Sequence, residues 1–80
     1  MSRLEDIVAG VVEGKLGEIG SLVQKALDEK IAIKEIIDNG LVKGMSVVAD
    51  RWKEGEYFVP EVLRSAKTMQ MGMDVLNTDG

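Results

Sequence analysis

Apolar residues recur three and four positions apart along most of the chain, a spacing typical of amphipathic α-helices. The first such stripe starts after Ser2 and Glu5, a capping-box pair that favours a helix start, and Gly14 marks its end. A second stripe runs from residue 16 to residue 27. The strict apolar–polar alternation of a β-strand does not extend beyond a few positions. The pattern therefore predicts an all-α fold.

A longer third stripe extends from residue 33 to residue 52 and is interrupted by Asn39, Gly40 and Gly44. We interpret it as one long helix that bends near Gly40, and two helices broken at that point are the alternative. Pro60 is expected to begin a fourth helix, because the first helical position needs no backbone N–H.

Short connections between four amphipathic helices favour neighbours that run in opposite directions. The expected architecture is therefore an antiparallel four-helix bundle. We assign residues 1–76 to this bundle and the polar residues 77–80 to the start of a linker.

The stripes also predict which large side chains are buried. Met45, Met69 and Met73 are expected to fill gaps in the core, because methionine adapts to irregular spaces. Trp52 continues the third stripe and is expected in the core as well, so Trp52→Ala should cost ~3–5 kcal/mol of stability. Met71 falls on another face of the fourth helix, which therefore carries more apolar surface than one bundle needs.

Composition narrows the chemistry that this chain can perform. Its 80 residues include no cysteine and no histidine, which removes thiolate metal sites and the commonest general base. The carboxylates alternate with lysine and arginine, so neither catalytic residues nor a metal site are expected. A net charge of −4 without a basic patch argues against nucleic-acid binding. Without a leader peptide or a long apolar run, we expect a cytoplasmic protein that does not enter membranes.

The segment from residue 55 to residue 69 holds two of the three aromatic residues and the only proline. An apolar residue just before a helix often packs back on its first turns as a hydrophobic staple. That arrangement explains one of Tyr57, Phe58 and Val59, but not all three. The alternative is a surface that presents these side chains to a ligand or a partner, and the pattern alone leaves both interpretations open.

The run from residue 40 to residue 69 resembles a specific protein family. The residues that carry the resemblance are Gly40, Leu41, Gly44, Met45, Val48, Trp52, Gly55, Glu56, Phe58, Val59, Pro60, Glu61, Val62, Leu63, Ser65, Ala66 and Met69. Their pattern is similar to the N-terminal helical cap domain of corrinoid (cobalamin-binding) methyltransferase proteins, a domain also found in methionine synthase. Residues 7–14 and 23–29 fit the first helices of that family, so the resemblance covers nearly the whole chain. Trp52 stands where the family more often has phenylalanine.

The resemblance implies a non-catalytic cap module of a corrinoid methyl-carrier protein. Such a cap covers the upper, methyl-bearing face of the cobalamin during methyl transfer in one-carbon metabolism. By the same resemblance, Phe58, Val62, Ser65 and Met69 would lie over the cofactor. The methyl donor and acceptor stay open, because separate methyltransferase subunits would select them.

The implied partners are those methyltransferase subunits and a Rossmann-like corrinoid-binding domain of the same protein, to which residues 77–80 would lead. In the family, a histidine of that second domain coordinates the cobalt from below. Because this chain has no histidine, no corrinoid is expected to bind it stably on its own. The alternative function is a helical protein-interaction or dimerisation module that uses the same apolar patch, and a homodimer of the isolated domain would fit it.

Overall fold

The computed structural model describes residues 2–79, with side chains described for residues 2–77. These residues form four helices and the turns between them. The helices are α1 (Arg3–Val12), α2 (Ile19–Asp28), a long third helix composed of α3 (Ile33–Ile36), η1 (Ile37–Leu41) and α4 (Val42–Lys53), and α5 (Val59–Asp79). No strand occurs among residues 2–79. The predicted all-α fold, a bundle of helices, is therefore confirmed.

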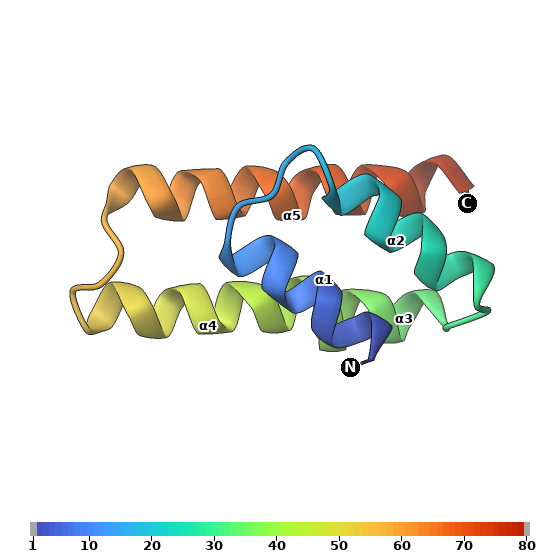
Figure 1. Ribbon diagram of the computed structural model, residues 1–80, viewed down its shortest axis with the longest axis horizontal. Helices are drawn as coiled ribbons and strands as arrows, with labels where there is room; N and C mark the ends of the chain where they lie inside the picture. The colour runs from blue at the N-terminus through green and yellow to red at the C-terminus, as the bar shows by residue number, and fades with distance from the viewer. Residues whose placement is uncertain (1, 80) are drawn as a thin grey trace.

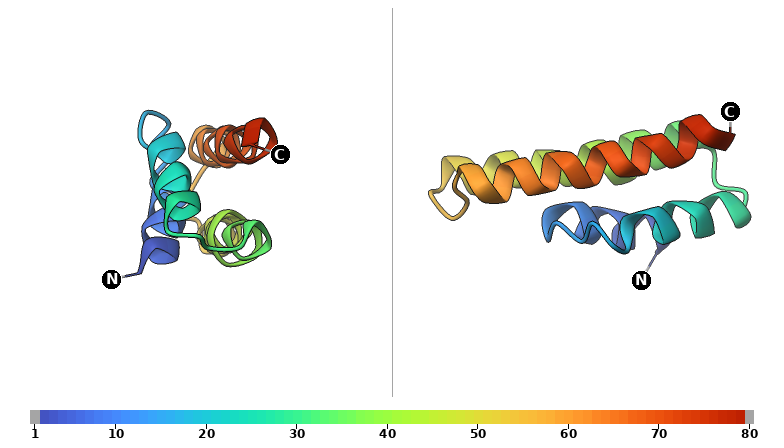
Figure 2. Two further views of the ribbon diagram at one scale, coloured as in Figure 1. Left: turned by 90° about the vertical axis from the view of Figure 1, so that its right-hand side faces the viewer. Right: turned by 90° about the horizontal axis from the view of Figure 1, so that it is seen from above.

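The helices pack in two layers, with α1 and α2 on one side and the long third helix with α5 on the other (Figures 1 and 2). After the loop at residues 54–58, α5 returns alongside α4 (Figure 1). At 1.5 Å per residue, the 21 residues of α5 span about 30 Å, whereas the 10 residues of α1 and of α2 each span about 15 Å. The loop end of the α4–α5 hairpin therefore projects beyond the first layer (Figure 2).

The predicted limits of the first helix are confirmed by its hydrogen bonds. The Ser2 hydroxyl accepts from the Glu5 backbone N–H at 3.1 Å, and the Glu5 carboxylate accepts from the Ser2 N–H at 3.0 Å. This reciprocal pair satisfies donors that a helix start leaves without partners. At the other end Gly14 adopts a φ of 67°, which ends the helix and turns the chain toward α2.

The long third helix does not break at Gly40. It continues through a π-helical turn, Ile37–Leu41, and Gly40 lies within this wider turn. A Cβ atom on Gly40 would lie 3.0 Å from Cγ2 of Ile7 in α1, so a side chain there would push α1 away. The irregularity expected near Gly40 is this π turn, and it lies in contact with α1.

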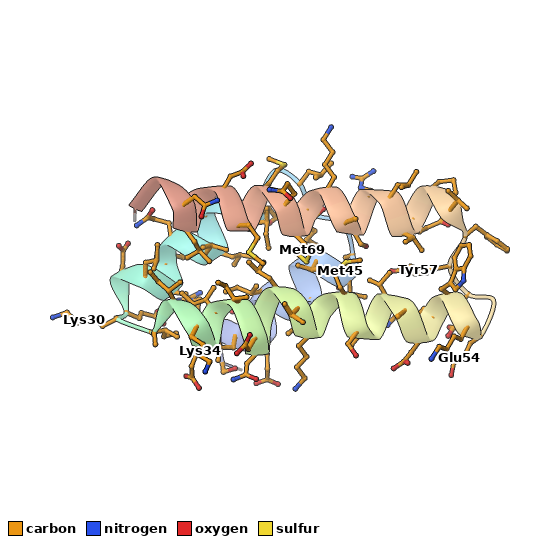
Figure 3. The ribbon with its side chains drawn as sticks, turned by 180° about the vertical axis from the view of Figure 1, so that it is seen from behind. Lys30, Lys34, Met45, Glu54, Tyr57 and Met69 are labelled. Atoms are coloured by element: carbon orange, nitrogen blue, oxygen red, sulfur yellow. The ribbon has the colours of Figure 1, made fainter. Side chains whose placement is uncertain are left out.

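The core lies between the two layers. Its buried residues are Ile7, Val11, Ile19, Val23, Ala26, Ile36, Leu41 and Leu76. Met45, Met69 and Met73 are partly buried and pack against the edge of this cluster, as predicted. Two partly buried methionines, Met45 of α4 and Met69 of α5, point toward each other between these helices (Figure 3).

The most deeply buried face of α5 combines small residues with Leu76. Ser65 and Thr68 are fully buried, and a Cβ atom on Gly72 would lie 2.7 Å from Cδ2 of Leu41. Both hydroxyls are satisfied by backbone carbonyls, those of Val12 and Arg64. Small side chains let α5 approach the other helices closely, while Met69 and Met73 pack against the core cluster beside them.

The prediction that Trp52 lies in the core is wrong. Its side chain is 49% exposed, because the last turn of α4 lies near the loop end of the hairpin, beyond the reach of α1 and α2. Val48, one turn earlier, is buried. A large loss of stability from Trp52→Ala is therefore no longer expected.

Two sequence-based assignments concern the chain end and the membrane. Helix α5 continues to Asp79, three residues past the predicted end of the bundle at Leu76, and Gly80 lies outside the described residues. The assignment of residues 77–80 to a linker stays a prediction. Among residues 2–79, every helix is too short or too polar to span a bilayer.

Two glycines test the close packing between the layers. A Cβ atom on Gly44 would lie 2.7 Å from Cβ of Val11, whereas one on Gly20 would meet only Val75, at 3.7 Å. Alanine gains about 1 kcal/mol of helix propensity over glycine, but overpacking costs ~1–3 kcal/mol. We expect Gly44→Ala to lower the free energy of unfolding and Gly20→Ala to leave it unchanged or raise it. Urea unfolding of both variants measures the difference, and equal values would contradict the packing described above.

Candidate functional site

An apolar groove of about 280 Å³ lies between the C-terminal half of α4 and the first turns of α5. The residues that line it are Met45, Val48, Ala49, Trp52, Val59, Val62 and Leu63. We call it the hairpin groove. Figure 3 looks onto this side of α4 and α5, with α1 and α2 behind them. All of the lining side chains are apolar or aromatic, so the groove presents a hydrophobic surface with almost no hydrogen-bonding capacity.

Large apolar side chains are exposed at the loop end of the hairpin, both among the lining residues and at Phe58, which precedes the lining residue Val59 in the chain. Phe58 is 64% exposed, Leu63 is 63% exposed, and Val59 and Trp52 are each about half exposed. A contiguous exposed patch of this kind, unlike scattered apolar residues, marks a surface that meets a ligand or a partner. The loop end of the hairpin is therefore the candidate functional site.

The loop that carries Phe58 is held by hydrogen bonds at both of its ends. Gly55, with a φ of 79°, ends α4, and the backbone N–H groups of Glu56 and Tyr57 donate to the Arg51 carbonyl at 2.9 and 3.2 Å. At the start of α5, the Glu61 carboxylate accepts from the Phe58 N–H at 2.7 Å. Phe58 is thus placed on a braced turn, and its ring projects into solvent.

Tyr57 differs from its two apolar neighbours. Its ring is partly buried, its hydroxyl donates to the Val12 carbonyl at 2.6 Å, and the Arg51 guanidinium lies 5.4 Å from the ring centroid. Phe58 and Val59 project outward instead. Tyr57 therefore packs against the end of α1, whereas Phe58 and Val59 are exposed, and a role of these two residues toward a ligand or a partner stays a prediction.

The four residues that the resemblance implied do not share one environment. Phe58 is exposed on the loop beside the groove residue Val59, and Val62 lines the groove. Met69 is partly buried farther along α5 (Figure 3). Ser65 is only 1% exposed, and its hydroxyl donates to the Val12 carbonyl at 3.3 Å. At about 100° per residue, Ser65 lies about 60° around the helix from Val62, toward α1. A role of these residues toward a cofactor stays a prediction.

Sequence reasoning missed several lining residues, above all Trp52, Ala49 and Leu63. The sequence pattern predicts burial of Trp52 and Ala49, because both residues continue the apolar stripe of the third helix. One signal could have identified them: the first two stripes are much shorter than the third. When two such short helices lie partly side by side, as α1 and α2 do (Figure 2), they leave one end of the hairpin uncovered, and here it is the end nearest Gly55.

The polar groups near the groove carry negative charge. The pKa of Glu54 is raised by a hydrogen bond with the Glu56 carboxyl, by the negative charge of Glu56 and, more weakly, by burial and by Asp50. These carboxylates belong to the turn and not to the groove lining. Among residues 2–79, no three carboxylates gather closely enough to hold a metal ion. The groove can therefore cover a ligand and exclude water, but it offers no side chain that would compete for a metal centre.

The carboxyl pair at the turn generates a pH-dependent prediction. Because the folded-state pKa of Glu54 is raised, stability is lost as the pH rises through that pKa, and it is fully present at lower pH. We expect Glu54→Gln to raise the melting temperature slightly at pH 7 and to have no such effect near pH 3, where the Glu54 carboxyl of the wild type is protonated. Melting temperatures measured across this range test the expectation. A difference that is constant with pH would contradict it.

Comparisons with known proteins give this site a family context. Residues 3–77 match a family described as "B12 binding domain". The chain is 38% identical over 79 residues to a corrinoid protein of Desulfitobacterium hafniense, covering 99% of this chain and 37% of that protein. It is 32% identical over 75 residues to monomethylamine corrinoid protein 2 of Methanosarcina acetivorans, covering 94% of this chain and 35% of that protein.

A solved structure shares the fold. The monomethylamine corrinoid protein of Methanosarcina barkeri superimposes with a TM-score of 0.92 at 27% sequence identity, covering 96% of this chain and 36% of that chain. This chain therefore spans a little over a third of the length of the relatives it matches. The family match extends over both layers of the fold, and the chain thus belongs to the B12 binding domain family, as a helical cap domain of the type found in corrinoid proteins.

Proposed function

We propose that this chain is the non-catalytic cap module of a corrinoid methyl-carrier protein, and that its hairpin groove covers the upper, methyl-bearing face of the cobalamin. The observation that carries this proposal is the uncovered apolar surface formed by Trp52, Phe58 and Leu63 at the loop end of the hairpin. Because the chain belongs to the B12 binding domain family, cobalamin is the ligand that this apolar surface would cover.

The residues present fit a covering role. The groove lining is apolar, and no cluster of acidic side chains able to bind a metal occurs among residues 2–79. Bound cobalamin supplies the cobalt centre that carries the methyl group. Phe58 and Leu63 would pack over that side of the cofactor and exclude water from it, and this burial would itself be favourable. Trp52 and Val62 would form the wall and floor of the cover.

The remaining two residues implied by the resemblance take different parts in this proposal. Met69 faces Met45 between α4 and α5, where two flexible thioether side chains can adjust to the shape of the ligand (Figure 3). Ser65 would act indirectly: its hydroxyl fastens α5 to the end of α1, and the neighbouring face of α5, which carries Val62, would meet the cofactor.

Partners of the whole protein are part of the same proposal. Residues 77–80 would lead to a Rossmann-like domain that binds the corrinoid, and separate cytoplasmic methyltransferase subunits would deliver and collect the methyl group. The names of two relatives include monomethylamine. The groove carries no polar group that would recognise an amine. We therefore assign the choice of methyl donor to those subunits.

A pair of exposed side chains tests the proposal. In a corrinoid protein that carries this chain as its helical domain, Phe58→Ala should accelerate loss of the methyl group under illumination several-fold, because the cover over the cobalt–carbon bond is opened. Ile33→Ala is the matched control, since Ile33 is also exposed but lies at the other end of the hairpin. It should leave the rate unchanged.

Stability measurements separate this effect from unfolding. An exposed Phe58 should cost less than about 1 kcal/mol when truncated, against ~3–5 kcal/mol for a buried phenylalanine. Equal rates of methyl loss in the Phe58→Ala variant and the wild type would contradict the proposal. If the isolated chain also formed a tight dimer that Phe58→Ala dissolves, the interaction-module alternative would be the better description.

A further inference from the structure

Three side chains from the start of α5 donate to the carbonyl groups at the end of α1. The Tyr57 hydroxyl and the Ser65 hydroxyl both donate to the Val12 carbonyl, at 2.6 and 3.3 Å, and Arg64 Nε donates to the Gly14 carbonyl at 2.8 Å. The Val12 carbonyl lies at the helix end, where carbonyls lack partners within the helix. The Gly14 carbonyl, just past the helix, also accepts from the Leu16 N–H at 2.9 Å. The end of α1 is therefore tied to the part of the molecule that carries the hairpin groove.

The contact between Gly14 and Arg64 is tightly built. Gly14 has a positive φ, and a Cβ atom there would lie 2.8 Å from the Arg64 side chain. Only glycine suits this position, for its backbone conformation and for the space that the arginine occupies. This tie connects α1 to the body of α5.

Tyr57 occupies a different position, because it precedes the helix. Its backbone N–H donates to the Arg51 carbonyl at the end of α4, and its hydroxyl reaches α1. The next residue in the chain is Phe58, the most exposed large apolar side chain of those described. Tyr57 is thus the one loop residue of the three donors, and it joins α1 and α4 immediately beside the rim of the groove.

We propose that Tyr57 is a positioning residue whose hydroxyl, bound to the Val12 carbonyl, fixes the loop that presents Phe58 at the rim of the hairpin groove. Ser65 and Arg64 cannot position the loop in this way, since both residues lie within α5 and are already held by the helix. The significance of the loop for a corrinoid rests on the proposed function, but the physical link between the Tyr57 hydroxyl and the loop does not.

Hydrogen exchange on the 80-residue chain tests that link directly. Tyr57→Phe removes only the hydroxyl and keeps the ring beside Arg51. We expect the amide protons of Glu56 and residue 57, which donate to the Arg51 carbonyl, to exchange at least about fivefold faster. The amide proton of Val23 in the core should keep its rate, because a local opening of the loop does not involve α2.

Thr68→Val is the matched control. It also removes a hydroxyl that donates to a backbone carbonyl, but that hydroxyl bonds within α5 and does not reach α1. The control should leave the exchange rates of the Glu56 and Tyr57 amides within twofold of the wild type. Unchanged loop amides in Tyr57→Phe, or an equal rise in Thr68→Val, would overturn the positioning role.

A second measurement distinguishes the two proposals. In a corrinoid protein that carries this chain, Tyr57→Phe should accelerate methyl loss under illumination about as Phe58→Ala does. If Phe58→Ala accelerates the loss and Tyr57→Phe does not, the positioning role fails and the proposed function stands. If neither variant alters the loss although the loop amides exchange faster, the cap function fails and Tyr57 still fixes the loop.

Discussion

The unequal length of the two layers is the constraint on which the rest of this structure depends. Helix α5 has 21 residues, whereas α1 and α2 have 10 each and lie partly side by side, so the first layer is shorter than the hairpin and leaves its loop end uncovered (Figure 2). Apolar residues are buried where α1 and α2 reach and exposed where they do not. Val48 and Trp52, one turn apart on α4, lie on either side of that limit. The hairpin groove is the consequence, since its rim consists of apolar positions that no helix covers.

Close packing between the helices elsewhere allows so small a domain to tolerate this uncovered apolar end. Glycines at positions 40, 44 and 72 let helices approach to distances at which any side chain would collide with Ile7, Val11 or Leu41. The hydroxyls of the buried face of α5 are all paired with carbonyls, so the close approach leaves no buried polar side chain without a partner among the described residues. We expect these closely packed helices to form a rigid support that holds the exposed apolar loop in one shape.

Much of the fold could be predicted because the signals are local. The capping pair at Ser2 and Glu5, the positive φ at Gly14 and the three-and-four spacing of apolar residues depend only on near neighbours in the chain. The family resemblance in residues 40–69 likewise identified a cap domain of corrinoid proteins, which the family match confirms. Local patterns also indicated an irregular turn near Gly40, although not that the helix continues there as a π turn.

The errors concern relations between helices that are distant in sequence. Periodicity placed Trp52 in the core because spacing does not reveal where a covering helix ends. It also did not reveal that the small polar residues Ser65 and Thr68 of α5 are fully buried beside Leu76. The Ser65 hydroxyl donates to the Val12 carbonyl of α1, which lies about fifty residues earlier in the chain. The difference between Tyr57, which contacts α1, and Phe58, which is exposed, likewise depends on a helix distant in sequence.

The central claim is that the hairpin groove lies close to the cobalt. The most direct test is nuclear magnetic resonance of a corrinoid protein that carries this chain and binds paramagnetic Co(II) cobalamin. The account predicts strong selective broadening of the methyl signals of Val62, Leu63 and Met69, while those of Ile33 stay sharp. Broadening confined to α1 and α2, or an equal effect on both ends of the hairpin, would contradict the claim that this groove covers the cofactor.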